Sequence, residues 1–515
     1  MRSTFGGLEI SKRSLFAHQA ALTTTGHNVA NANTKGYSRQ IVNLVASRPI
    51  EAPGYMRSSA PGQLGQGVEY KSISRIREQF LDDQFRNENK ALGSWSIRQD
   101  TLEKIEAIIN EPSETGIRTV IDKFWKAWSD FSKDPENIDG RKIVRESAMT
   151  LADGFNDVSR RLTDLSADLT ENIQVKANQI NTITQAVAKL NSEIQRVEGL
   201  GDNANDLRDQ RDLLVDDLSK IVNIDVIETE TGYDILMGGI SLVAGHTFTD
   251  VDSGILESAL ASGDLTAGEV HGMLLSRDQF VTSYLKELDI MANTIANGKV
   301  TITIPAGSVL PDNTTIGGVT YTGAARTLTS DLTVEVDGLN GLHQLGYNFE
   351  NTDGAPVFFT SKDGGPITAA NMQLNVDIQN NANLIASSLR TSGTPESVVR
   401  GNNTAALLLS QLRDSKYTFD LGGGTTTSNT VDDYFRSVIG QLGIQANEAN
   451  RQTTNQQMLV EQVDARRLSV SGVSLDEEMT NMIKFQHAYN AAARAMTTFD
   501  EMLDKVINSM GVVGR

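Results

Sequence analysis

The stretch SLDEEMTNMIKFQHAYNAAARAMTTFDEMLDKVINSM, residues 474–510, has the most regular pattern in the chain. Two sets of residues recur there at every seventh position: Leu475, Met482, Tyr489, Met496, Leu503 and Met510, and then Phe485, Ala492, Phe499 and Val506. Two apolar positions in every seven residues are typical of a coiled coil. Ser474 followed by Glu477 is typical of a capping box at the start of a helix. The pattern predicts a long C-terminal helix that packs on a partner helix.

The N-terminus offers such a partner. Residues 1–35 favour one helix in which a leucine or valine recurs every seven residues, while the second seam position is polar at Lys12 and Gln19. Because so narrow an apolar stripe does not hold a helix in water alone, we predict that the two terminal helices pair in one domain, residues 1–45 plus 465–515. The predicted assembly interface consists of the seam residues Leu8, Leu15, Leu22, Val29, Leu475, Met482, Phe485, Tyr489, Met496, Phe499, Leu503 and Val506.

The middle of the chain contains further helical patterns. Apolar residues recur every three or four positions through residues 151–197, which predicts a helix of roughly 70 Å. On the next helix, Arg208 and Asp212 are four residues apart, and we expect them to form an ion pair. Three other segments also favour helix: 272–297, 380–413 and 430–465. A Gly-Thr stretch at 422–427 is predicted to be a flexible connection.

Two segments change to the alternating pattern of strands. Residues 221–260 and 298–378 contain short runs such as KVTITI, broken by Gly and Thr, and residues 37–75 favour an extended or hairpin segment. We therefore predict a mainly α, elongated, multidomain chain with inserted β modules and paired terminal helices. Besides the terminal domain, the predicted domains are a helical rod-like domain of residues 46–220, 271–297 and 379–464, a small β module at 221–270 and an inserted β region at 298–378.

The composition excludes several classes of protein. The chain has 515 residues and no cysteine, so disulfides and thiolate sites are excluded. Its 46 Lys and Arg against 65 Asp and Glu give a net charge of −19, which argues against a nucleic-acid binder or an anionic-membrane binder. There is no apolar run long enough to insert into a membrane and no apolar block typical of a cleaved signal peptide near the N-terminus.

Motifs for catalysis, cofactors or metals do not emerge. The six histidines show neither metal-ligand spacing nor a catalytic motif, and the sequence has no G-x-S-x-G elbow and no P-loop. The loop at 134–140 has its glycine at the wrong place for a calcium loop. We therefore expect no enzyme activity and no cofactor, although carboxylates that come together only in the fold are invisible in the sequence.

Both ends of the chain resemble a known family. The segment LTTTGHNVANANTKGYSRQ at 22–40 resembles the signature of the bacterial flagellar axial proteins, which include rod, hook and hook-associated proteins. VSGVSLDEE at 470–478 and FQHAYNAAAR at 485–494 resemble the hook-associated protein 1 family, as do NDLRDQRD at 205–212 and LHQLGY at 342–347. The resemblance covers nearly the whole chain except about 298–338. The motif residues are Asn28, Ala30, Asn31, Gly36, Tyr37, Asp476, Glu477 and Glu478.

This resemblance implies a structural subunit at the hook–filament junction. Such a subunit is exported through the flagellar type III apparatus without a cleaved signal and assembles helically outside the cell on the hook tip. The implied partners are other copies of the chain, the hook protein, the next hook-associated protein, and a cytosolic export chaperone that holds the C-terminal helix. Independently, pairing the terminal helices leaves Phe16, Met479 and Ile507 facing outward, and repeated head-to-tail contacts between such surfaces give helical tubes.

Two alternatives remain open from the sequence. The first is another axial subunit of the hook-protein type, against which the segment SGVSLDEE argues. The second is a secreted adhesin or enzyme that acts through the β modules at 221–260 and 298–378. A ligand or metal requirement of those modules would favour it.

Overall fold

The computed structural model describes residues 5–48, 65–109 and 116–508, and the chain forms two compact units. Unit 1 comprises Met1–Ser94, Gln174–His271 and Thr453–Arg515, and unit 2 comprises Trp95–Ile173 and Gly272–Gln452. Both units contain long helices and small antiparallel sheets, so the predicted mainly α class with inserted β modules is confirmed.

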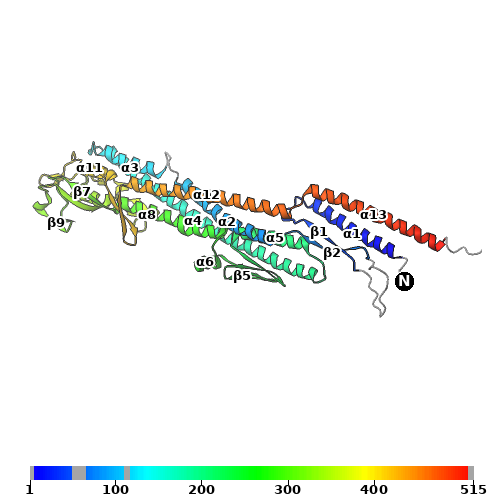
Figure 1. Cartoon of the computed structure of the whole chain (residues 1–515). Helices are drawn as coiled ribbons and strands as arrows, with labels where there is room; N and C mark the ends of the chain where they lie inside the picture. Colours follow the sequence, from blue (N-terminus) through cyan, green and yellow to red (C-terminus); the bar gives the residue numbers. More distant parts are fainter. Residues whose placement is uncertain (1–4, 49–64, 110–115, 509–515) are drawn as a thin grey trace, which may run out of the picture. The chain divides into compact units, whose positions relative to one another are not determined.

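The two terminal helices of unit 1 pack along one another, as predicted (Figure 1). They are α1 (Gly6–Ala30) and α13 (Leu475–Asn508). The buried face of α1 is made of small and polar side chains: Ser11, Ala17, Ala21, Thr24, Thr25 and Asn28. The two helices approach closely at Gly7, where an added Cβ would lie 2.5 Å from the ring of Phe499 and the ring would have to shift.

The N-terminal sequence prediction needs two corrections. Lys12 and Gln19, predicted to complete the seam, are exposed, because small residues fill the contact with α13 instead. The helix ends at Ala30 and not at residue 35, since the chain turns through Asn31 to a left-handed Gly36 with φ +81°. The last heptad residue of the C-terminal pattern, Met510, lies outside the described residues.

A hairpin follows α1 and lies against it. Strands β1 (Gln40–Ala46) and β2 (Val68–Arg75) pair antiparallel, from Gln40 opposite Arg75 to Ala46 opposite Val68, with a bulge between Asn43 and Leu44. The prediction of an extended or hairpin segment is therefore confirmed for the described part of residues 37–75.

The remaining elements of unit 1 combine helices with a four-stranded meander. Its sheet has the order β3-β4-β5-β6, with β3 (Asp225–Thr229), β4 (Gly232–Met237), β5 (Ile240–Ala244) and β6 (Thr247–Phe248), as predicted for 221–260. The helices that contribute to the unit are α2 (Gln79–Ile109), α4 (Ile138–Glu198), α5 (Asn205–Ile221), α6 (Ser253–Ser262), α7 (Glu269–Leu275) and α12 (Val431–Ser471). The predicted helix over 151–197 is confirmed within the 61 residues of α4.

Unit 2 combines helices with a second antiparallel sheet of order β10-β7-β15-β16. Its strands are β7 (Lys299–Ile304), β10 (Leu332–Asp337), β15 (Tyr417–Gly422) and β16 (Thr425–Asn429). Short hairpins pair β8 (Thr314–Ile316) with β9 (Val319–Tyr321), β11 (Phe359–Ser361) with β12 (Met372–Leu374), and β13 (Thr391–Ser392) with β14 (Ser397–Val398). The helices of this unit are α3 (Ile117–Phe131), α8 (Thr282–Asn297), α9 (Gly338–Leu345), α10 (Val376–Asn380) and α11 (Thr404–Gln411), with parts of α2, α4 and α12.

Two predictions in this unit were wrong. Residues 380–413 are not one helix, because asparagine side chains hold the backbone in turns: Asn402 Oδ1, for example, accepts from the Leu389 N–H at 2.9 Å. The stretch 422–427 is not a flexible connection between helices but the turn and start of a hairpin. Three glycines with positive φ, Gly422 to Gly424, make the turn, and the threonines after them form β16.

Candidate functional site

The motif residues of the two chain ends meet around Asn28, which is only 1% exposed. Its Nδ2 donates to the carbonyl of Gln40 and to Glu478 Oε2, both at 2.9 Å. Its Oδ1 accepts from the Gln40 N–H at 3.0 Å and from the Tyr37 hydroxyl at 2.8 Å. Because all four hydrogen-bonding positions of the amide are used, Asn28 fixes α1, the segment after it and the start of α13 in one geometry.

Arg39 clamps the start of α13 from the same side. Its guanidinium donates to Glu478 Oε1 at 2.8 Å and to Glu477 Oε2 at 2.7 Å, and its N–H donates to the Ser471 carbonyl at 2.8 Å. Glu478 is 2% exposed, so this ion pair is shielded from solvent on one side. The predicted capping box is thereby altered: Ser474 Oγ accepts from the Glu477 N–H at 3.5 Å, but the Glu477 carboxylate binds Arg39.

Tyr37 stays a neutral donor in this network. Burial raises the pKa of its hydroxyl, and the nearby charges of Asp206, Asp209 and Glu478 raise it further. Nδ1 of His27 lies 3.0 Å from the same hydroxyl. We name the set of Asn28, Tyr37, Arg39, Glu477 and Glu478 the terminal clamp.

The other motif residues have local roles. Gly36 packs on α5, because a Cβ there would lie 3.1 Å from Leu213 Cβ in a backbone conformation that L side chains rarely adopt. Asn31 ends α1, and its amide donates to the His27 carbonyl at 3.1 Å. Ala30 and Asp476 are exposed and lie outside the terminal clamp.

A second polar assembly lies beside the clamp and was not foreseen. We name it the arginine–aspartate cluster, and its members are Arg75, Arg77, Arg86, Arg467, Asp82, Asp209, Asp212 and Asp216. Arg75 Nη1 lies 2.8 Å from Asp209 and 2.6 Å from Asp212. Arg467 Nη2, from α12, lies 2.8 Å from Asp216. Four cations and four anions from five segments thus balance one another in a buried site.

The NDLRDQRD segment of α5 supplies the anions that tie this cluster to the chain end. The Ser38 N–H donates to Asp209 Oδ2 at 2.8 Å. The predicted ion pair between Arg208 and Asp212 is wrong, because Arg208 Nε lies 2.6 Å from Glu198 Oε1 while Asp212 faces Arg75. The sequence does not show which partner Arg208 takes, because a pair with Asp212 and a pair with Glu198 are both compatible with a helical Arg208.

Asp212 is the electrostatic centre of the cluster. Burial alone would raise its pKa, but the guanidiniums of Arg77, Arg75 and Arg86 lower it to about 2. In contrast, burial raises the pKa of Asp209 despite its bonds to Ser38 and Arg75. The ionised form of Asp212 is therefore part of the folded structure.

The predicted seam residues of α13 divide into two groups. Leu503 is buried, and Met482, Phe485, Tyr489 and Met496 are half-buried, as are Leu8, Leu15, Leu22 and Val29 on α1. Leu475, Phe499 and Val506 are exposed. Other large apolar side chains are exposed on the same two helices. Together they make what we call the terminal apolar surface: Phe16, Leu475, Met479, Ile483, Phe499, Met502, Val506 and Ile507.

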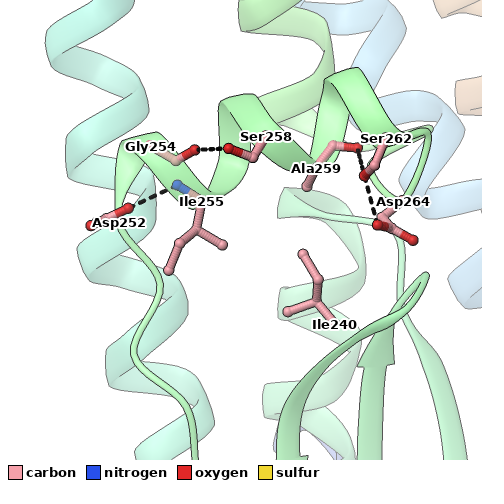
Figure 2. A pocket seen from close by; sticks show the side chains of 8 residues that line it. All are labelled: Ile240, Asp252, Gly254, Ile255, Ser258, Ala259, Ser262 and Asp264. Atoms are coloured by element: carbon pink, nitrogen blue, oxygen red, sulfur yellow. Dashed lines mark hydrogen bonds between the residues drawn. The ribbon is translucent and has the colours of Figure 1, made fainter.

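A pocket lies on the β module of unit 1, between β5 and α6, and Figure 2 shows the residues that line it. Its volume is about 630 Å³. Its polar groups are engaged locally. Asp252 Oδ1 accepts from the Ile255 N–H at 2.8 Å, and Ser262 Oγ donates to Asp264 Oδ2 at 2.6 Å. The Ser258 hydroxyl donates to the Gly254 carbonyl. These bonds shape the turn and the helix that border the pocket.

Within residues 5–48, 65–109 and 116–508, no three histidine or carboxylate side chains are grouped as a metal site would need. No helix of these ranges has the length and apolar character of a membrane span.

Comparison with known proteins now decides the family. Residues 102–299 match the family model of the flagellar hook-associated protein FlgK helical domain, and residues 465–510 match that of the flagellar basal body rod FlgEFG protein C-terminal region. The chain is 34% identical over 532 residues to flagellar hook-associated protein 1 of Bacillus subtilis, and the match covers 100% of both chains.

The chain belongs to the flagellar hook-associated protein 1 family. Flagellar hook-associated protein 1 of Escherichia coli is 25% identical, with 96% of this chain and 98% of that protein covered. Among solved structures, the flagellar hook junction protein FlgK from Burkholderia pseudomallei matches 75% of this chain and 100% of its own chain with a TM-score of 0.48 and 15% identity.

Family membership confirms the resemblance found in the motifs, and it places the chain with the hook-associated proteins, which are flagellar structural proteins, rather than with the hook proteins. The family is part of the external flagellum, and the match at residues 465–510 links α13 to the other axial proteins.

Proposed function

We propose that the chain is a non-enzymatic structural subunit at the hook–filament junction of a bacterial flagellum. It assembles helically with its own copies on the hook tip and supports the next hook-associated protein and the filament. One observation carries the proposal: in a member of the hook-associated protein 1 family, the terminal helices pair and still expose several large apolar side chains. Exposed apolar patches of this kind mark interaction sites.

The terminal domain, residues 1–45 plus 465–515, is the assembling part in this proposal. The clamp and the arginine–aspartate cluster hold its helices in a fixed orientation, so that neighbouring copies meet a preformed surface. The helical rod-like domain and the β modules at 221–270 and 298–378 serve as structural parts of the subunit. No cofactor, nucleic acid or membrane insertion enters the assembly.

The proposal also includes the route by which the chain reaches the hook tip. The chain is exported by the flagellar type III apparatus without a cleaved signal peptide and acts outside the cell. Before export, a cytosolic chaperone covers the apolar face of the α13 segment. A helix with exposed apolar residues suits a partner that binds helices in a groove.

The test is the capping of isolated hooks by the full chain, seen by electron microscopy. We compare the unchanged chain with Met479→Ser combined with Ile483→Ser, both about half exposed at 50% and 53%. The matched control is Leu200→Ser, which removes an 83% exposed leucine outside the terminal helices. We expect the unchanged chain and the control to cap the hooks and the double variant to cap at most a tenth as many. Failure of the unchanged chain to bind hooks would contradict the proposal.

A further inference from the structure

The outer end of the β1–β2 hairpin is apolar and basic. Leu44 lies opposite Tyr70 in the pairing register, and these side chains are 36% and 50% exposed. Val45 beside them is exposed as well. Lys71 and Arg48 are exposed at the same end together with one carboxylate, Glu69, and among the described residues neither cation forms an ion pair. A two-stranded hairpin is marginally stable alone, so the exposed apolar pair Leu44 and Tyr70 favours a further partner.

The C-terminal end of α13 is apolar and acidic. Met502 and Ile507 are 56% and 65% exposed. Asp500, Asp504 and Ile507 follow the spacing of one helix flank, and Glu501 is exposed next to them. Lys505 is exposed at the same end, and among the described residues no cation forms an ion pair with these three carboxylates. This end therefore has the apolar character of the hairpin end and the opposite charge.

The two ends lie on different sides of the same helix. α1 contacts both the hairpin and α13, and in Figure 1 α1 runs between them. Surfaces that are complementary but lie on different sides of one subunit cannot satisfy each other within that subunit. Contacts of this heterologous kind join copies head to tail and produce an open helical assembly.

We propose that the hairpin end of one copy binds the acidic end of α13 of the next copy. This inference rests on the proposed self-assembly and names the contact that carries it. Leu44 and Tyr70, which are opposite one another in the hairpin, cover the apolar side chains of α13, while Lys71 and Arg48 face Asp500, Glu501 and Asp504. Opposite charges fix the register and speed the encounter more than they add affinity, so the contact is sensitive to salt.

Charge reversal on full-length chains tests this contact. The hairpin variant combines Arg48→Glu with Lys71→Glu, the helix variant combines Asp500→Lys with Asp504→Lys, and the third chain carries all four changes. Lys416→Glu is the control, because it reverses an exposed lysine of unit 2 that pairs with no described carboxylate. Assembly is measured as hook capping and as sedimentable polymer, and circular dichroism checks that each chain is folded.

We expect each double variant to lose assembly at least tenfold and the fourfold variant to regain at least half of it, while the control assembles normally. Equal mixtures of the two double variants should co-assemble better than either alone. Two results would overturn the contact: normal assembly of both double variants, or loss of assembly that the fourfold variant does not restore. If the unchanged chain does not assemble, the proposed function itself fails, and this contact fails with it.

Discussion

Unit 1 and unit 2 hold their family motifs in place by different physics. In unit 1, the NDLRDQRD motif enters a buried cluster of four arginines and four aspartates. In unit 2, the LHQLGY motif places His343 among aromatic rings: the Trp128 and Phe358 centroids are 5.5 Å apart, and those of His343 and Phe358 are 5.0 Å apart. One core is ionic and directional, while the other is apolar and close-packed.

Arginine shows the difference between the units, because burial is offset by carboxylates in unit 1 and is not offset in unit 2. Burial would lower the pKa of Arg77, yet Asp212 and Asp82 raise it, so the charge is stabilised in unit 1. Arg141 of unit 2 is fully buried beside the Phe349 ring, 3.6 Å from its centroid, and it donates to Ser387 Oγ and to carbonyls. Burial and the charge of Arg400 lower the pKa of Arg141 to about 9. Directional pairs in unit 1 fix orientation, which a subunit that presents its terminal helices to neighbours needs.

The largest expected effect is the removal of the central charge of unit 1. Asp212→Asn leaves Arg75, Arg77 and Arg86 without their shared anion, and we expect the free energy of unfolding to fall by about 3–5 kcal/mol. Hydrogen exchange of the α5 amides measures the loss. Tryptophan fluorescence should change less, because Trp95, Trp125 and Trp128 are the chain's three tryptophans and all lie in unit 2.

Asp217→Asn on the same helix is the control, because its partner Lys35 is exposed and 3.4 Å away. We expect it to change stability by less than about 0.5 kcal/mol. Equal effects of the two substitutions would show that the cluster contributes nothing beyond a surface ion pair.

The second effect is a difference in acid sensitivity. Burial lowers the pKa of His343 to about 4, while its hydrogen bond to the Pro356 carbonyl opposes this shift. The ordinary pKa of histidine is about 6.5. The neutral His343 side chain therefore makes its full contribution to the free energy of unfolding of unit 2 above pH 6.5. This contribution falls by about 3 kcal/mol in total as pH falls towards 4. Asp212 has a lowered pKa of about 2, so its contribution is lost only as pH falls from its ordinary value of about 3.8 to about 2.

Acid titration followed by tryptophan fluorescence and by hydrogen exchange of α5 separates the two units. We expect unit 2 to weaken first, at the higher pH. His343→Gln should flatten the pH dependence of unit 2 between pH 6.5 and 4, whereas His246→Gln, at an exposed histidine, should leave it unchanged. Simultaneous loss of the fluorescence signal and of the α5 protection near pH 2 would contradict the role of His343 in the acid sensitivity of unit 2.

The smallest effect concerns the contact between the terminal helices. Gly7→Ala places a Cβ against the ring of Phe499, which can shift because it is 39% exposed, so we expect a cost of about 1 kcal/mol. Gly6→Ala is the matched control, since a Cβ there meets nothing within 4 Å and alanine favours helix. Hydrogen exchange in α1 measures both, and equal protection in the two variants would argue against the close approach of α1 to α13.

The sequence allowed the helices and their pairing to be predicted, because heptad spacing is a local property. It misled on the contact face of α1, because large apolar residues define a heptad while Ser11, Ala21 and Thr25 make the contact. Likewise, segment 380–413 was taken for helix because its apolar residues recur, whereas its asparagines bind the backbone.

The site was predicted only in part, for a different reason. The motifs identified Asn28, Tyr37 and Glu478, but the bond between Asn28 and Glu478 spans 450 residues of chain. Such a contact leaves no periodicity in one sequence. Arg39 and the arginine–aspartate cluster were missed for the same reason, since a single arginine or aspartate on a helix reads as a solvated residue.

The most direct test of the terminal surface as the assembling part is hydrogen exchange of the full chain before and after it binds isolated hooks. If α1 and α13 carry assembly, protection should rise at least tenfold in residues 475–508 and in the part of α1 around Phe16, and the β3–β6 meander of unit 1 should not change. Protection that rises only in the β modules, with the terminal helices unchanged, would contradict it.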